Sequence, residues 1–129
     1  MANKRIFISF PEEDSVLRDF IVGQSRNEQC PFEFVDMSIK EALPQSEWKS
    51  RCRTKIKGCD GLIAHITKNT KQASGELFEI NCALEENVPA IGIYSSSDKY
   101  SYPIYLPNQL SGKAMEWNWN NIHNWIKKL

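Results

Sequence analysis

Residues 60–86, DGLIAHITKNTKQASGELFEINCALEE, decide the fold class. The apolar run at 62–66 has the length and the β-branched content of a buried strand. After a polar loop, Leu77, Ile80 and Leu84 recur at the spacing that places them on one side of a helix. We expect Ser74 to cap that helix, because its hydroxyl can accept a hydrogen bond from a free amide of the first turn. The stretch therefore predicts a strand, a loop and a helix in succession.

Two glutamates lie near the start of this expected helix. At about 100° per residue, Glu76 lies about 60° from the centre of the apolar stripe and Glu79 about 120° from it, so we expect neither in the core. Both follow the carboxyl end of an expected parallel strand, which is where open α/β sheets bind ligands. Two interpretations stay open: a carboxylate that faces a cleft, or acids that only complement the helix dipole.

The rest of the chain repeats the alternation of strand and helix. We expect further strands at residues 5–10, 32–35, 90–94 and 114–117, and helices at residues 14–23, 46–58 and 118–129. Ser46 is the expected cap of the second of these helices, and Asn118 or Asn120 that of the last. Residues 95–112 form a long irregular segment, and loops of that length are commonly functional or mobile. The pattern predicts one α/β domain, residues 1–129, with a parallel sheet of about five strands and helices on both faces.

The helix expected at residues 46–58 is basic. Its apolar stripe is Trp48, Cys52 and Ile56, which are four residues apart. The basic residues around the stripe are Lys49, Arg51, Arg53, Lys55 and Lys57. A solvated face is the ordinary explanation, and a site for phosphates or for an acidic partner is the alternative.

The net charge and the spacing of the cysteines limit which partners and metal sites are expected. Sixteen basic and sixteen acidic side chains cancel, so charge gives no argument for nucleic acid or a membrane surface as partner. No segment has the length of a membrane span and no signal-peptide cleavage site follows the first apolar run, so we expect a cytoplasmic protein. The cysteines lack metal-ligand spacing, so we expect buried thiols and no metal site. They are Cys30, Cys52, Cys59 and Cys82.

The sequence lacks the residues that three familiar classes of parallel α/β protein need for their functions. A receiver domain needs an aspartate at the end of the third strand, where His65-Ile66-Thr67 stands. A flavodoxin needs a phosphate loop rich in Ser, Thr and Gly, where Phe10-Pro11-Glu12-Glu13 stands. The G-x-G-x-x-G fingerprint of a Rossmann dehydrogenase is absent from the sequence.

The residues at the expected strand ends resemble those of TIR domains. Residues 6–10, IFISF, are similar to the first TIR strand, and Val35-Asp36 to the end of the second. The segment that begins at Met37 and ends at Pro44 resembles the BB loop, and residues 74–83, SGELFEINCA, the Ser-to-Glu-to-Ala signature of the third helix. The likeness spans nearly the whole chain and is nearest the small bacterial TIR-like group that includes the Thoeris anti-phage sensor. It implies a flavodoxin-like, TIR-type fold.

The resemblance also implies an activity. Glu79, four residues before Ala83, matches the catalytic glutamate of TIR enzymes that cleave NAD⁺. NAD⁺ is then a substrate, no cofactor is expected, and the product is ADP-ribose or a cyclic ADP-ribose-type signal. Such a diffusible nucleotide would act on a separate effector in anti-phage defence. The expected substrate-binding residues are Ser9, Phe10, Asp36, Ser38, Trp48 and Ser74, although Trp48 fits the core equally well.

The chemistry is reasonable for a single acid. The bond between nicotinamide and ribose already has a cationic leaving group, so one carboxylate can orient the ribose hydroxyls and stabilise an oxocarbenium ion. In related assemblies the BB loop of a neighbouring protomer completes the site, so we expect self-association on activation. The sequence departs from the family at residues 75–78, GELF, where many TIR enzymes have a Trp and a Cys, and at Leu43-Pro44, where a Pro-Gly pair is usual. A non-catalytic TIR-like adaptor and a nucleoside deoxyribosyltransferase-like enzyme are the alternatives.

Overall fold

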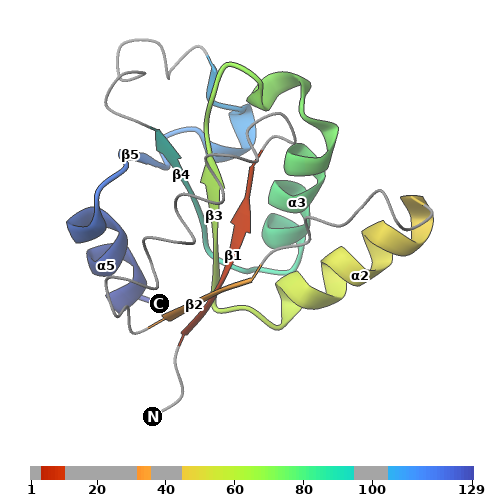
Figure 1. Cartoon of the computed structure of the whole chain (residues 1–129), viewed down its shortest axis with the longest axis horizontal. Helices are drawn as coiled ribbons and strands as arrows, with labels where there is room; N and C mark the ends of the chain where they lie inside the picture. Colours follow the sequence, from red (N-terminus) through yellow and green to blue (C-terminus); the bar gives the residue numbers. More distant parts are fainter. Residues whose placement is uncertain (1–3, 11–31, 36–44, 95–104) are drawn as a thin grey trace.

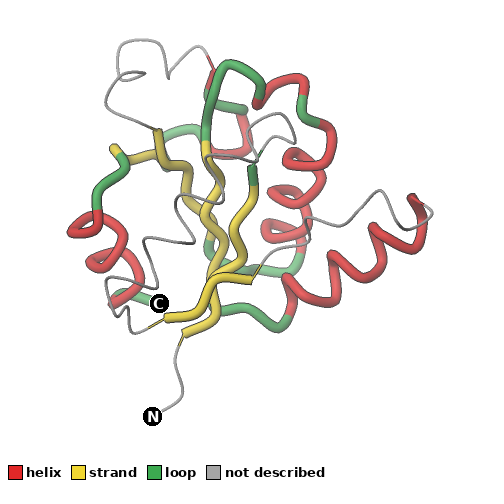
Figure 2. Tube along the Cα trace, viewed as in Figure 1, coloured by secondary structure: helices red, strands yellow, loops and turns green. Residues whose placement is uncertain are grey.

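A five-stranded parallel sheet forms the centre of the molecule (Figures 1 and 2). The computed structural model describes residues 4–10, 32–35, 45–94 and 105–129. Its strands are β1 (Lys4–Ser9), β2 (Phe32–Val35), β3 (Gly61–His65), β4 (Ala90–Tyr94) and β5 (Ala114–Glu116). They are ordered β2-β1-β3-β4-β5, and every neighbouring pair is parallel. The predicted α/β fold class is confirmed.

The strand order creates a switch point between β1 and β3. From β1 the chain crosses to β2 on one side, and it then returns to β3 on the other side of β1. Ser9, the last residue of β1, is paired in register with Ala64 of β3. In open parallel sheets the carboxyl ends of two such strands flank the usual ligand crevice.

Helices cover both faces of the sheet, as expected (Figure 1). On one face lie α2 (Gln45–Lys57) and α3 (Ser74–Glu85), and on the other lies α5 (Trp119–Lys127). Alternate residues of β1 serve the two faces: Phe7 packs with the α2 and α3 side chains, whereas Ile6 and Ile8 pack with those of α5. Short 3₁₀ helices, η3 (Thr70–Gln72) and η5 (Asn108–Leu110), complete the described elements.

The expected helix caps are partly wrong. Asn118 caps α5, since its side chain accepts a hydrogen bond of 2.7 Å from the backbone N–H of Asn121. Ser74, in contrast, is the first residue of α3; the cap position is Ala73, and no side chain caps the helix there. Ser46 also lies inside its helix, because α2 begins at Gln45.

Some expectations lie outside the described residues. These are the helix at residues 14–23, Cys30, the segment at 37–44 and most of the irregular segment at 95–112. Within the described residues the other three cysteines are buried free thiols, as predicted. A helix able to cross a membrane is not found in that part of the chain.

Candidate functional site

Glu79 reaches from α3 to the carboxyl end of β1. The Ser9 hydroxyl donates a hydrogen bond of 2.5 Å to Glu79 Oε1, and both side chains are buried, Ser9 fully and Glu79 with 7% exposed. The structure therefore joins two predicted site residues that are 70 positions apart in the sequence. The contact lies beside the switch point of the sheet, because Ser9 ends β1 and α3 follows β3.

The prediction that neither glutamate enters the core is wrong. Glu76 is 1% exposed and Glu79 is 7% exposed, whereas Leu77 and Leu84 of the expected apolar stripe are only half-buried. The reason is that α3 packs against the sheet on one side and against α2 on another. A helix between two neighbours buries a wider arc than its apolar stripe defines.

A buried thiol contacts the second oxygen of the same carboxylate. Cys52 Sγ of α2 lies 3.5 Å from Glu79 Oε2 as a hydrogen-bond donor, and the cysteine is fully buried. Burial raises the pKa of the Cys52 thiol far above its usual range, and the negative charge of Glu79 adds to the effect. The thiol therefore keeps its proton at neutral pH and can donate it to the carboxylate.

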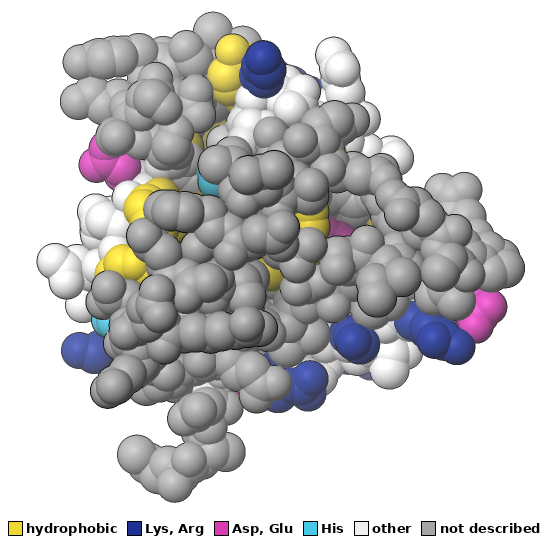
Figure 3. Space-filling model, viewed as in Figure 1, with side chains coloured by type: hydrophobic (Ala, Val, Ile, Leu, Met, Phe, Trp, Pro, Cys, Tyr) yellow, Lys and Arg dark blue, Asp and Glu magenta, His cyan; other side chains and the backbone are white. Residues whose placement is uncertain are grey.

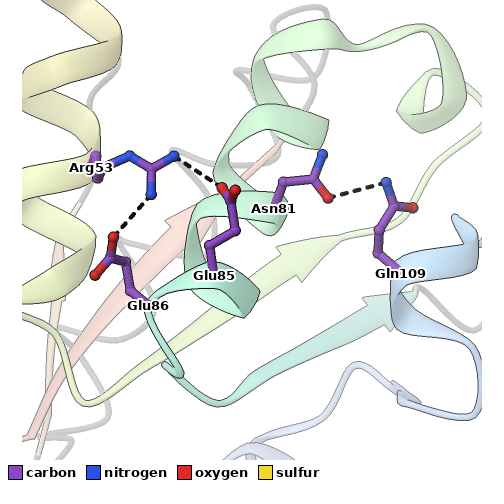
Figure 4. Close-up of polar contacts among 5 residues, drawn as sticks. All are labelled: Arg53, Asn81, Glu85, Glu86 and Gln109. Atoms are coloured by element: carbon purple, nitrogen blue, oxygen red, sulfur yellow. Dashed lines mark hydrogen bonds and ion pairs between the residues drawn. The ribbon is translucent and has the colours of Figure 1, made fainter.

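Polar contacts on the surface fix α3 in place (Figure 4). The Arg53 guanidinium of α2 donates two hydrogen bonds of 2.9 Å, one to Glu85 and one to Glu86 at the end of α3. Hydrogen bonds to these carboxylates raise the pKa of Arg53. On the other side of α3, Gln109 Nε2 donates to Asn81 Oδ1 at 3.3 Å. These contacts hold the helix that carries Glu79 against its neighbours.

The loop between β3 and α3 is fastened by two buried threonines. Thr70 Oγ1 accepts a hydrogen bond of 2.8 Å from the backbone N–H of Thr67 and donates to the carbonyl of His65 at 3.4 Å. Thr67 Oγ1 accepts from the backbone N–H of Asn69 at 3.0 Å. From the sequence this segment is expected only to be a polar loop. The signal for its internal hydrogen bonds is the pair of hydroxyl side chains, which can bond nearby backbone groups.

The other expected site residues are in different surroundings. Phe10 follows Ser9 directly and is half-buried, and Ser74 is exposed at the start of α3. Trp48 is 4% exposed and packs against Phe78, with 5.7 Å between ring centroids, so it takes the core position that was its alternative interpretation. Asp36, Ser38 and the segment at residues 37–44 lie outside the described residues.

The basic side of α2 is a solvated face. Lys49, Arg51, Lys55 and Lys57 are exposed, and Figure 3 shows Lys and Arg side chains along this edge of the molecule. Arg51 pairs with Glu47 one turn earlier at 2.8 Å, and Lys49 Nζ lies 5.3 Å from the centroid of the Phe78 ring. The positive charges of Arg51 and Lys49 therefore have partners within the chain, a carboxylate for Arg51 and an aromatic ring for Lys49.

Solved structures share this fold, among them these two. One contains the TIR domains of the activated Roq1 resistosome, which directly recognises the pathogen effector XopQ; it has 15% identity, a TM-score of 0.55, and covers 77% of this chain. The chain spans 61% of that structure's own length. The other is a prokaryotic SEFIR domain, with 17% identity, a TM-score of 0.57, and coverage of 98% of this chain and 94% of that one.

The comparisons establish the fold. No protein-family model and no curated protein sequence matches the chain. The TIR-like fold expected from the sequence motifs is confirmed by the structural neighbours. Among the described residues, no group of three or more His, Cys, Asp and Glu side chains is placed to hold a metal ion.

Proposed function

We propose that the chain is a TIR-like enzyme of bacterial anti-phage defence that consumes NAD⁺. It breaks the bond between nicotinamide and ribose and forms a cyclic ADP-ribose-type nucleotide that acts on a separate effector. The observation that carries the proposal is the position of Glu79, whose carboxylate lies at the carboxyl end of β1 in contact with Ser9. The residues around it resemble the signature of the TIR catalytic helix.

The proposed reaction needs one carboxylate. The C1′–N bond of NAD⁺ breaks, and its electron pair leaves with neutral nicotinamide. Glu79 orients a ribose hydroxyl and stabilises the positive charge that develops on the sugar. An atom of the adenine or of the other ribose of the same molecule then bonds to C1′; a hydroxyl acceptor gives its own proton to solvent, and an adenine ring nitrogen becomes neutral when the amino group gives a proton to solvent. A carboxylate oxygen has two lone pairs, so Oε1 can bind Ser9 and a ribose hydroxyl at once.

The test follows nucleotides during infection. Cells that express the wild-type protein should lose NAD⁺ and gain a cyclic ADP-ribose isomer after phage addition, as measured by mass spectrometry. Glu79→Gln should abolish both changes. Glu85→Gln is the matched control. Glu85 is exposed on the same helix, and glutamine keeps an oxygen that can accept from Arg53, so this variant should behave as the wild type. Unchanged nucleotides in wild-type cells, or an active Glu79→Gln variant, would contradict the proposal.

One observation favours the adaptor alternative. Both oxygens of Glu79 are bound within the fold, by Ser9 of β1 and by Cys52 of α2, so the carboxylate also ties three elements together. In an adaptor this tie would be its whole role, and the exposed basic side of α2 would contact a partner. If the adaptor alternative holds, Arg51→Glu should remove protection against phage. Nucleotide levels in cells that express the wild type should then stay constant during infection.

A further inference from the structure

Cys52 has no role in the proposed reaction as described above. It is the middle residue of the apolar stripe of α2, between Trp48 and Ile56, and all three are buried. An aliphatic side chain would serve the core at such a position. The thiol instead lies 3.5 Å from Glu79 Oε2 and donates a hydrogen bond to it.

Two donors to Glu79 in the described part of the chain come from different elements and bind different oxygens. Ser9 of β1 donates to Oε1, and Cys52 of α2 donates to Oε2. A buried carboxylate with one hydrogen bond could still rotate about its terminal torsion, because that torsion is broad. Two donors on opposite oxygens restrict this rotation.

We propose that Cys52 is a positioning residue, whose thiol holds the Glu79 carboxylate in the orientation set by Ser9. Its effect on turnover rests on the proposed function, whereas its effect on the carboxylate does not. A thiol is a weak donor, so we expect it to adjust the carboxylate and not to replace the stronger bond from Ser9.

Charged and titratable neighbours of this contact lie on both helices. Cys52 and the exposed Lys55 come from α2, and Glu76 and Cys82 lie one turn before and one turn after Glu79 on α3. Hydrogen bonding to the charged form of an acid lowers its pKa, so loss of the Cys52 donor should raise the pKa of Glu79. Loss of the Cys82 thiol, which is also buried, tests whether cavity formation alone has that effect.

The experiment measures the titration of Glu79 directly. The side-chain carboxyl ¹³C signal of Glu79, assigned by its loss in Glu79→Gln, is followed against pH in the wild type, Cys52→Ala, Cys52→Ser and Cys82→Ala. The midpoint should rise in Cys52→Ala, stay near the wild-type value in Cys52→Ser, which keeps a donor, and stay unchanged in Cys82→Ala. Cys52→Ser also serves if the alanine variant does not fold.

Kinetics then connects the carboxylate to the reaction. With NAD⁺ as substrate, kcat of Cys52→Ala should fall about three- to tenfold, the usual worth of one hydrogen bond. KM should stay within about twofold, and the rising limb of the pH profile should move to higher pH because Glu79 must be ionised. Cys52→Ser should recover most of the loss.

The outcomes separate the two proposals. A Glu79 midpoint that does not move in Cys52→Ala, or that moves equally in Cys82→Ala, overturns the positioning role. A midpoint that moves only in Cys52→Ala supports that role even if the wild-type protein leaves NAD⁺ intact. In that case the NAD⁺-consuming function fails and the positioning role stands.

Discussion

At the scale of the residue, Glu79 is a buried acid that needs donors. An ionised carboxylate removed from water is costly unless it is hydrogen-bonded, and Ser9 and Cys52 supply that bonding. The sequence motif identified Glu79 and Ser9 as candidates. It did not predict their burial, because the helical stripe was drawn through apolar residues alone. The sequence placed Cys52 in the apolar stripe of its helix but did not predict its contact with Glu79, which lies 27 positions later on another element.

The same burial predicts how stability depends on pH. The folded-state pKa of Cys52 lies well above the ordinary value of 9.0, chiefly because of burial. Above pH 9 the unfolded chain loses a thiol proton that the folded chain keeps, so the free energy of unfolding should fall as pH rises. The slope from this thiol is about 1.4 kcal/mol per pH unit. Below pH 9 the thiol is neutral in both states, and its contribution is constant.

Urea denaturation between pH 8 and pH 10.5 measures this slope. Other groups titrate in the same range, so the wild type is compared with Cys52→Ser, whose hydroxyl does not ionise. The wild type should lose more stability over the interval than the variant. Equal losses in the two proteins would show that Cys52 does not stay protonated in the folded state.

At the scale of the element, periodicity located the strands well and the helix starts less well. Strands β2 and β4 have the expected bounds, since a proline precedes each of them and a polar residue, Asp36 or Ser95, follows it in the sequence. Asn118 has a free amide within reach at Asn121 and caps α5 as expected. Ser74 does not cap α3, because the helix begins one residue earlier than a Ser74 cap requires. The chain enters α3 from η3, and the carbonyl of Ala73 accepts the first helical hydrogen bond, from the N–H of Leu77. That geometry depends on a 3₁₀ turn that the sequence analysis did not predict.

Gly61 allows α5 to approach β3 closely. A Cβ atom at Gly61 would lie 2.8 Å from Cη2 of Trp125 and 3.0 Å from Cδ1 of Leu129. Gly61→Ala should therefore lower the free energy of unfolding by about 1–3 kcal/mol, as overpacked cores do. Gly58→Ala is the matched control, because its Cβ would meet its nearest neighbour, Arg5, at an ordinary 3.5 Å. It should change stability by less than about 0.5 kcal/mol.

Chemical denaturation of the two glycine variants decides the point. Both are followed by tryptophan fluorescence, to which Trp125 contributes together with the other three tryptophans of the chain. Equal midpoints for Gly61→Ala and the wild type would mean that α5 does not pack against β3 as described.

At the scale of the whole molecule, the sheet order brings the site together. Periodicity could predict the strand positions but not the neighbours of β1, because it carries no information about pairing at long range; for those neighbours the sequence offered only the resemblance to a flavodoxin-like fold. The order β2-β1-β3-β4-β5 sets β1 beside β3 and so brings Ser9 within reach of α3. The TIR-like fold alone does not determine whether the protein is a catalyst, since one fold supports many functions. Any catalytic activity depends on the residues of the site.

Ligand binding should stabilise the whole fold. A ligand that binds only the folded state adds about 2.7 kcal/mol at 100 times its dissociation constant. The Glu79→Gln variant, which should bind NAD⁺ without cleaving it, should melt at a higher temperature when NAD⁺ is added. Deoxynucleosides should have no such effect. Stabilisation by deoxynucleosides and not by NAD⁺ would favour the deoxyribosyltransferase-like alternative.

In the proposed reaction the Glu79 carboxylate promotes cleavage of the bond between nicotinamide and ribose. The most direct measurement is nicotinamide release from added NAD⁺ by protein recovered from phage-infected cells, with equal amounts of folded wild type and Glu79→Gln. We expect steady release by the wild type and a loss of at least about a hundredfold in the variant, because the carboxylate stabilises the charge that develops on the sugar. Equal release by the two proteins would contradict it.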